Sequence, residues 1–202
     1  MVDTMRVLRP LCGVCAVALI AAYLASAEAQ SALHAVSDPK GLFSISIPSD
    51  WSVASSQMSE AVFHGLRTSG MGQHVISTLA AHSGGEALPA ILAVAAVDLP
   101  ERVSPAAFAE AVKGQLPSGW EVTQDGRATI AGHDARYLYF IMHQTDYALY
   151  MVMTYFNVGR TGFLVVGGTL NEQDSIRKHF ATISQILETF RPSPKLGAFT
   201  AR

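Results

Sequence analysis

The sequence has little cysteine, little net charge and few clusters of basic residues. Its 202 residues include two cysteines, and 14 basic residues against 16 acidic ones leave a formal charge of −2. Nucleic-acid binding depends on clustered Lys and Arg, so this balance argues against a nucleic-acid partner. Half of the residues are apolar (50%), which excludes a disordered or low-complexity chain. The composition is that of a globular protein.

The common catalytic signatures are also missing. The sequence contains no G-x-S-x-G nucleophile motif and no H-E-x-x-H zinc motif. Ser175–Lys178 fits S-x-x-K, but the companion motifs of that enzyme class are absent or in the wrong order. A glycine pair at 70–72 begins like a dinucleotide-binding loop but lacks its third glycine. We therefore expect no enzyme, no catalytic residue and no cofactor.

A short apolar segment near the N-terminus predicts a secretory signal peptide. Arg6 and Arg9 precede an apolar run over 11–25, which is shorter than the roughly 20 residues that a membrane-spanning helix needs. Small residues follow in the small-x-small pattern that signal peptidase accepts. We expect cleavage after Ala29, or alternatively after Ala27. The mature protein would then be periplasmic or secreted, with no stable membrane span.

Both cysteines lie inside this predicted signal peptide. Cys12 and Cys15 have the C-x-x-C spacing of redox and metal sites, but cleavage would remove them. The mature chain would then have no disulfide, no thiolate metal site and no cysteine nucleophile. Two alternatives stay open: the segment is kept as a membrane anchor, or translation begins at Met5, which preserves the basic residues.

Apolar runs separated by turn residues predict an antiparallel sheet. A strand or tail over 30–37 leads to a turn at 38–41, after which Phe43, Ile45 and Ile47 alternate with serines. Asp125-Gly126 predicts a hairpin turn. The last three strands are joined by connections too short for crossovers, so they must be antiparallel. After the first strand, further strands are expected over 75–81, 90–97, 120–123, 135–142, 148–156 and 163–166.

Two helices are expected to cover the sheet, because the later strands are apolar on both faces. Ser104 and Pro105 are an N-cap and a first-turn residue for a helix over 105–116. Asn171 is the expected N-cap of the second helix. Its apolar residues recur at intervals of four and three: Ile176, Phe180, Ile183, Leu187 and Phe190. The predicted fold class is α+β, an antiparallel sheet sandwiched between α-helices in one domain.

Several motifs of the chain are similar to those of a known family. They are Gly-Leu-Phe-Ser-Ile-Ser-Ile-Pro-x-x-Trp at 41–51, Ile-Ala-Gly-His-Asp-Ala at 130–135, Gly-Phe-Leu-Val-Val at 162–166 and Thr-Phe-Arg-Pro at 189–192. Over residues 40–192 the chain resembles the PsbP-like α/β/α-sandwich superfamily, which includes bacterial envelope proteins of the DcrB type. The resemblance implies a non-enzymatic accessory or binding module. It carries over no functional residue, because no binding motif matches.

The expected organisation is a signal peptide at 1–29, a lead-in at 30–40, the PsbP-like domain at 41–192 and a tail at 193–202. Residues 52–73 have little periodicity and predict a long loop or flap. Because binding residues are often carried by loops, this segment and the adjoining sheet edge are the expected working surface.

Methionine and histidine gather in and after this loop. Imidazole and thioether groups suit copper, and a chain without cysteine would have to use them. The alternative to the accessory role is therefore a periplasmic copper-binding protein that uses segment 58–82. Its candidate ligands are Met58, His64, Met71, His74 and His82.

Five of the six tyrosines lie on or beside the central predicted strands: Tyr137, Tyr139, Tyr147, Tyr150 and Tyr155. Tyrosine is favoured where one end of a side chain is apolar and the other is wet. The pattern predicts either a covered sheet with hydroxyls at its edges or a tyrosine-lined groove for a peptide or small ligand. The sequence thus favours an exported binding or accessory protein of the bacterial cell envelope, whose partner is an envelope protein or a small ligand.

Overall fold

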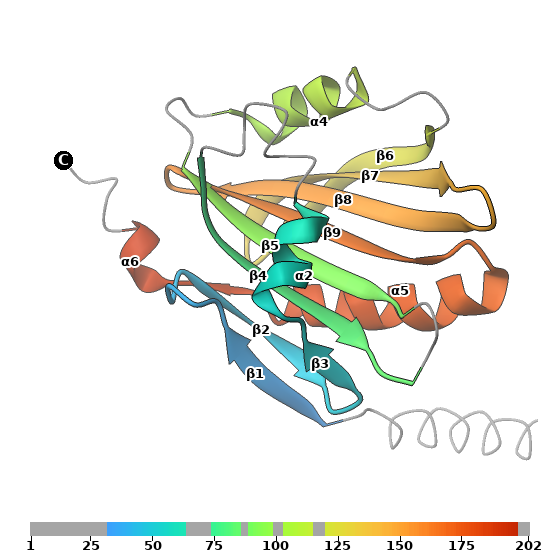
Figure 1. The fold of residues 1–202 in the computed structure, drawn as a ribbon. Coiled ribbons are helices and arrows are strands. Elements are labelled where there is room, and N and C mark those ends of the chain that lie inside the picture. Colours follow the sequence, from blue (N-terminus) through green and yellow to red (C-terminus); the bar gives the residue numbers. More distant parts are fainter. Residues whose placement is uncertain (1–31, 64–73, 86–88, 99–102, 115–119, 198–202) are drawn as a thin grey trace, which may run out of the picture. The chain divides into compact units, whose positions relative to one another are not determined.

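The computed structural model describes residues 32–63, 74–85, 89–98, 103–114 and 120–197. They lie almost entirely in one compact unit, Leu33–Arg202, and Figure 1 shows their elements in chain order. The elements are β1 (Leu33–Ser37), β2 (Phe43–Pro48), β3 (Trp51–Val53), α2 (Ser56–Val62), β4 (Val75–Ser83), β5 (Ile91–Asp98), α4 (Pro105–Lys113), β6 (Trp120–Ile130), β7 (His133–His143), β8 (Ala148–Val158), β9 (Thr161–Leu170), α5 (Gln173–Glu188), β10 (Arg191–Pro192) and α6 (Pro194–Gly197).

The strands form two sheets, and every described pairing is antiparallel. The larger sheet has seven strands in the order β3-β4-β5-β9-β8-β7-β6, and the smaller has three in the order β1-β2-β10. The three consecutive hairpins between β6 and β9 keep neighbours in sequence adjacent in space. The antiparallel arrangement expected from the short connections is confirmed.

The seven-stranded sheet is covered on both faces, which confirms the predicted α+β sandwich. One face packs against α5 and the small sheet, through a cluster that joins Phe43 and Ile45 of β2 to Phe163 of β9 and Ile183 of α5. The other face packs against α4 and the end of α2, where Phe108 contacts Tyr155. Alternate side chains of each central strand are therefore buried on opposite faces of the sheet, which explains why these strands have nearly continuous apolar sequences.

The described part of the predicted loop at 52–73 is partly regular, so that expectation was wrong there. Trp51, 4% exposed, anchors β3, and Val53 pairs with Ala81 of β4. Helix α2 follows, with the Ser55 hydroxyl accepting a hydrogen bond from the Met58 amide at 3.3 Å. Short elements of this kind depend on burial of a few residues and leave little periodicity in the sequence. Residues 64–73 lie outside the described residues.

The hairpin predicted at Asp125-Gly126 was also wrong, because β6 runs straight through both residues. Gly126 pairs with Tyr137, and a Cβ at this glycine would overlap the Tyr137 phenol ring. The glycine therefore makes room for a ring on the neighbouring strand. The chain reverses instead at Ala131-Gly132, whose φ angles of 51° and 80° are those of a type I′ turn.

Helix α5 is present as predicted but begins one residue later and is rotated. The Asn171 amide still donates to the Ala148 carbonyl of β8, so Glu172 becomes the N-cap. The buried line of the helix is His179, Ile183 and Ile186, and it continues to Phe190 beyond the helix end. Phe180 and Leu187 of the predicted stripe are only partly buried. This rotation brings both side chains to the flank of the helix, where the candidate site lies.

The two ends of the described unit pack against β2. The Ser193 amide donates to the Leu42 carbonyl at 2.7 Å, and Leu196 of α6 is buried.

Among the described residues, no helix has the length and hydropathy needed to span a bilayer.

Candidate functional site

A groove opens between α5 and strands β6, β7 and β8, on the face of the large sheet that carries α5. Its volume is about 260 Å³. We call it the aromatic groove. It is lined by Ala128, Thr129, Ile130, Ala131, Tyr137, Tyr139, Val152, Thr154, Phe180, Ile183, Ser184, Leu187 and Glu188.

The groove exists because the second layer on this face is narrower than the sheet. Helix α5 packs mainly on β9 and β2, and the small sheet covers the β4–β5–β9 part of the face. Strands β6 and β7 extend past this layer at the far side of the sheet, as Figure 1 shows. Side chains of β7 and β8 fill part of the remaining space, and the flank of α5 closes one wall.

The wall and floor of the groove share a group of stacked and tilted rings. Tyr139 lies centrally, with ring centroids 5.3 Å from Tyr137, 5.6 Å from Tyr150 and 5.7 Å from Phe180. Tyr150 and Phe180 are 5.0 Å apart. Rings at these separations, in offset or edge arrangements, attract one another beyond simple burial. The cluster links side chains of β7, β8 and α5.

The polar groups of the groove are hydroxyls and one carboxyl group. The Tyr137 hydroxyl accepts a hydrogen bond from Gln124 Nε2 at 3.1 Å. Burial raises the pKa of Tyr139, and the neighbouring Tyr150 and Tyr137 raise it further, so this phenol stays neutral at physiological pH. Of the lining residues, Glu188 alone is charged, and none is histidine, lysine or arginine. Such a lining suits a neutral, largely apolar ligand that is oriented by hydroxyl groups.

The tyrosines predicted from sequence divide between different environments. Tyr137 and Tyr139 line the groove and Tyr150 stacks on Tyr139, whereas Tyr147 is 41% exposed in the β7–β8 turn. Tyr155 points to the opposite face of the sheet. The sequence could not separate these positions without the register of β7 against β8, in which Tyr139 faces Val152 and Arg136 faces Tyr155.

Tyr155 is buried in the second core and has no role in the groove. Its ring stacks on Phe108 of α4 with centroids 4.1 Å apart. Its hydroxyl is buried and, among the described residues, has no hydrogen-bond partner. Burial raises the pKa of Tyr155 to about 12. An unpaired buried hydroxyl costs free energy, so this group lowers the stability of the fold.

Sequence reasoning missed the lining residues of β6 and β8 and also those of α5. Ser184 and Glu188 lie on its exposed side, and Phe180 and Leu187 were predicted as core. The only sequence signal for Phe180 and Leu187 was their place on a helical stripe, which does not distinguish a fully buried side chain from one that is partly buried beside a groove. Ser184 and Glu188 had no such signal.

The described metal candidates are not gathered into one site. His74 precedes β4, and His82 lies near its other end, where Nδ1 is 3.0 Å from the Ser83 carbonyl oxygen. Eight residues of extended chain span about 26 Å, so these two imidazoles cannot share an ion. Met58 is 39% exposed on α2. His64 and Met71 lie outside the described residues, and within the described part of the chain no group of three or more His, Cys, Asp or Glu could hold a metal. The copper hypothesis stays a prediction.

Comparisons with known proteins identify the fold. No protein-family model matches the chain, and no curated protein sequence matches it. A protein of Bacteroides thetaiotaomicron matches with a TM-score of 0.55 and 11% identity, over 82% of this chain and 50% of that one. The chain thus spans half the length of the Bacteroides protein.

Two further structures match over nearly their full lengths. LpqN, involved in cell envelope biogenesis of Mycobacterium tuberculosis, has a TM-score of 0.52 and 14% identity, over 87% of this chain and 97% of its own. Cyanobacterial PsbP from Synechocystis has a TM-score of 0.51 and 11% identity, over 81% of this chain and 94% of its own. The resemblance expected from the sequence motifs is confirmed: the chain has a PsbP-like fold. At these identities the likeness concerns the fold alone.

Proposed function

We propose that the protein is an exported, non-enzymatic binding or accessory module of the bacterial cell envelope, and that the aromatic groove holds its ligand. The observation that carries this proposal is the groove itself. It is open, lined by aromatic and aliphatic side chains of β6, β7, β8 and α5, and bordered by the ring contacts of Tyr139 with Tyr150 and Phe180.

The lining supports a ligand of defined chemistry. A volume of about 260 Å³ lies just below the lower end of the usual range for small-molecule sites, roughly 300 Å³. It has room for one ring or one branched aliphatic group, either of a small molecule or of a side chain on a partner protein. The tyrosine and threonine hydroxyls would orient a polar atom on that group, and Glu188 at the rim disfavours an anion.

The cellular part of the proposal is supported by the sequence and the fold. The basic residues, short apolar run and small residues at the N-terminus fit an export signal. LpqN, which shares the fold, is involved in cell envelope biogenesis. A binding role also agrees with a lining that offers hydroxyls beside apolar surface.

Ligand binding can be tested with fluorine NMR on protein that contains 3-fluorotyrosine. Neutral ring fragments (indole, phenol and cyclohexanol) are titrated into the protein. The signals of Tyr137, Tyr139 and Tyr150 are expected to shift, and that of Tyr155, on the opposite face, to stay in place. If none of the fragments moves the three groove signals, or if all tyrosine signals move equally, the groove is not the binding site.

A matched pair of variants on α5 separates groove binding from surface binding. Ser184 and Ala181 are both exposed on this helix, but only Ser184 lines the groove. Ser184→Trp is expected to fill the groove and abolish the fragment-induced shifts, whereas Ala181→Trp is expected to leave them unchanged. Equal binding by both variants would contradict the proposal. Both substitutions lie at exposed positions, so both variants are expected to fold.

A further inference from the structure

Strand β6 forms a long outer edge of the seven-stranded sheet. It has 11 residues, and among the described residues it pairs only with β7. Residues 121–125 are exposed along this edge. On the outer side, alternate residues present backbone N–H and C=O groups that no described strand satisfies, which makes the edge a template for another strand.

The charges along this edge have an unusual arrangement on the face that carries α4. Asp125 lies opposite Leu138 and Arg127 opposite Arg136, so Asp125 and Arg127 both point to this face. Lys113 of α4 forms an ion pair with Asp125. Arg127 is directly opposite another arginine, which is unfavourable in a cross-strand pair, and within the described part of the chain no carboxylate forms an ion pair with it.

Gly126 separates the two charged residues, so the segment is complementary to itself. In an antiparallel pair centred on Gly126, Asp125 lies directly opposite Arg127 of the partner subunit, and Arg127 opposite the partner's Asp125. Side chains directly opposite one another have Cβ atoms about 4.5–5.5 Å apart and lie on the same face. Both contacts would form on the α4 face, and each would place a carboxylate beside Arg127, which lies opposite Arg136 within its own chain.

We propose that the edge strand β6 is a self-association surface, on which a second copy of this chain pairs antiparallel about Gly126 and joins the two seven-stranded sheets. A twofold pairing of this kind uses the same patch on both copies. The backbone hydrogen bonds supply the attraction, and the two Asp125–Arg127 contacts fix the register. This inference is independent of any ligand in the aromatic groove.

Neighbouring registers fit less well. Pairing centred on Arg127 would place that residue against its own copy in the partner subunit. Pairing centred on Asp125 would place Arg127 opposite Thr123, at the bulge between Val122 and Gln124 where β6 is irregular. The Gly126 register avoids both faults.

The same register would also bring the two copies together beside the aromatic groove. Ala128 lines the groove, and the Gly126 register places Gln124 of the partner subunit directly opposite it. Gln124 and Ala128 both lie on the α5 face, with the residues paired to Tyr139 and Ala135. A partner amide at this position would add a hydrogen-bonding group to the rim.

Charge reversal provides a direct test, read by sedimentation equilibrium of the exported protein at about 10 μM to 1 mM. The unmodified protein is expected to form a dimer as concentration rises. Asp125→Arg and Arg127→Asp each place like charges opposite one another twice. Each is expected to raise the dimer Kd at least about tenfold. The double variant D125R/R127D restores complementarity and is expected to bring the Kd back to within about threefold.

The two single variants also test the register in mixture. Asp125→Arg carries two arginines and Arg127→Asp carries two aspartates, so neither should pair with itself, but together they should form a heterodimer visible by native mass spectrometry. A matched control uses D174R mixed with R177D. These residues also form an acid–base pair, at 3.8 Å on the exposed side of α5, and the changes to net charge are the same.

Loss of the Lys113–Asp125 ion pair could itself affect the fold, so Lys113→Ala is included. It removes the same intramolecular contact and is expected to leave the dimer intact. A protein that stays monomeric at 1 mM overturns the proposal. So does a dimer whose Kd is unchanged in both single variants, or a control mixture that forms heterodimers as readily as the β6 mixture.

Discussion

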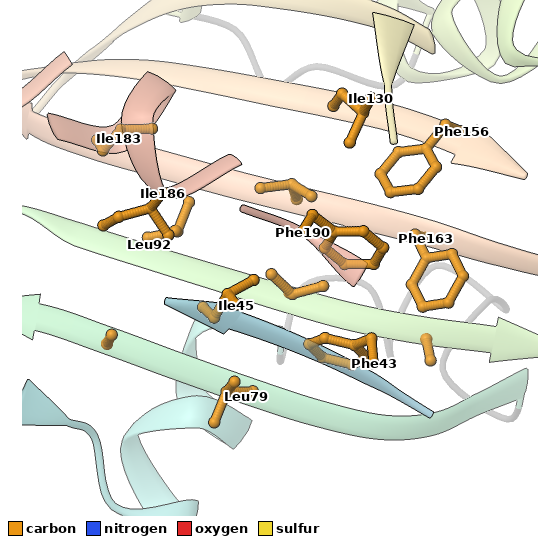
Figure 2. Close-up of a cluster of buried hydrophobic side chains, with 14 of the residues drawn as sticks. Phe43, Ile45, Leu79, Leu92, Ile130, Phe156, Phe163, Ile183, Ile186 and Phe190 are labelled. Carbon is orange, nitrogen blue, oxygen red and sulfur yellow. The ribbon is translucent and has the colours of Figure 1, made fainter. Parts of the chain in front are cut away.

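The α5 face of the large sheet is filled with aromatic rings at both ends, but the rings differ in kind. Figure 2 shows the closed end, where Phe43 of the small sheet meets Phe156, Phe163 and Phe190. The contacting rings of this cluster have centroids 5.1–5.7 Å apart. At the open end Tyr137, Tyr139, Tyr150 and Phe180 lie 5.0–5.7 Å apart. Because the ring spacing is similar in both clusters, it does not distinguish the hydrophobic core from the candidate site.

The difference lies in the hydroxyl groups and in what covers them. The closed cluster has a second layer above it and uses rings without a polar atom, because an unpaired polar atom there would cost free energy. The open cluster lies beside the aromatic groove, and two of its tyrosines, Tyr137 and Tyr139, line that groove. Tyr155 is the exception, a tyrosine in a closed layer with an unpaired hydroxyl. The following predictions use this contrast, from the largest expected effect to the smallest.

The largest effect is expected from truncating a ring of the closed cluster. Phe163 is fully buried and contacts Phe43, Phe156 and Phe190. Phe163→Ala is expected to lower the free energy of unfolding by about 3–5 kcal/mol, because it leaves a cavity among rings that cannot collapse. Urea denaturation followed by circular dichroism measures the loss. A loss below about 1 kcal/mol would show that the closed cluster contributes little to the stability of the fold.

Alkaline pH is expected to act through Tyr155. Its pKa in the folded protein is about 12, above the ordinary value near 10, so the folded state holds this proton more tightly than the unfolded state. The stabilisation is complete below about pH 10 and is lost as pH rises toward 12. A difference of two units corresponds to about 3 kcal/mol. Denaturation curves from pH 9 to 12 should show this loss relative to Tyr155→Phe, which has no such proton; parallel curves would contradict it.

The glycine beside Tyr155 is expected to be intolerant of a side chain. A Cβ at Gly162 would lie 2.5 Å from the Tyr155 hydroxyl oxygen, and the stack on Phe108 restricts the ring. Gly162→Ala is expected to cost about 2 kcal/mol by overpacking. The double variant G162A/Y155F should recover most of that cost, because the overlapping oxygen is gone. Additive effects in the double-mutant cycle would show that the two residues do not interact.

Removing the Tyr155 hydroxyl alone is expected to stabilise the protein. The hydroxyl is buried and, among the described residues, unpaired. Tyr155→Phe is therefore expected to raise the free energy of unfolding by about 1 kcal/mol at neutral pH. Thermal and urea denaturation both report this change. A destabilised variant would mean that the hydroxyl has a partner.

The smallest effect on stability is expected in the open cluster. Tyr139 is half-buried, and its ring contacts do not depend on its hydroxyl. Tyr139→Phe is expected to change the free energy of unfolding by less than about 0.5 kcal/mol. The same variant is expected to weaken the binding of phenol in the groove more than the binding of a ring without a hydroxyl group, such as cyclohexane. A stability loss as large as that of Phe163→Ala would remove the distinction between the two ends.

Much of the fold follows from local sequence patterns. The alternation from Phe43 to Ile47 and the apolar runs from β7 to β9 predicted strands that are present. The four-and-three spacing of apolar residues predicted α5. These signals depend on the period of a helix or a strand, which neighbouring residues determine.

The sequence by itself determined the antiparallel hairpins, two covering helices and a concentration of tyrosines on adjacent strands. Only the tertiary structure decided which tyrosines share a face, that β6 continues through Gly126, and that α5 turns Phe180 and Leu187 toward an opening. Each of these three features depends on the register between strands or on how much of the large sheet is covered by α5 and the small sheet, which are built from distant segments of the chain. A one-residue change in register moves every side chain to the other face, so residues within one segment cannot encode these features alone.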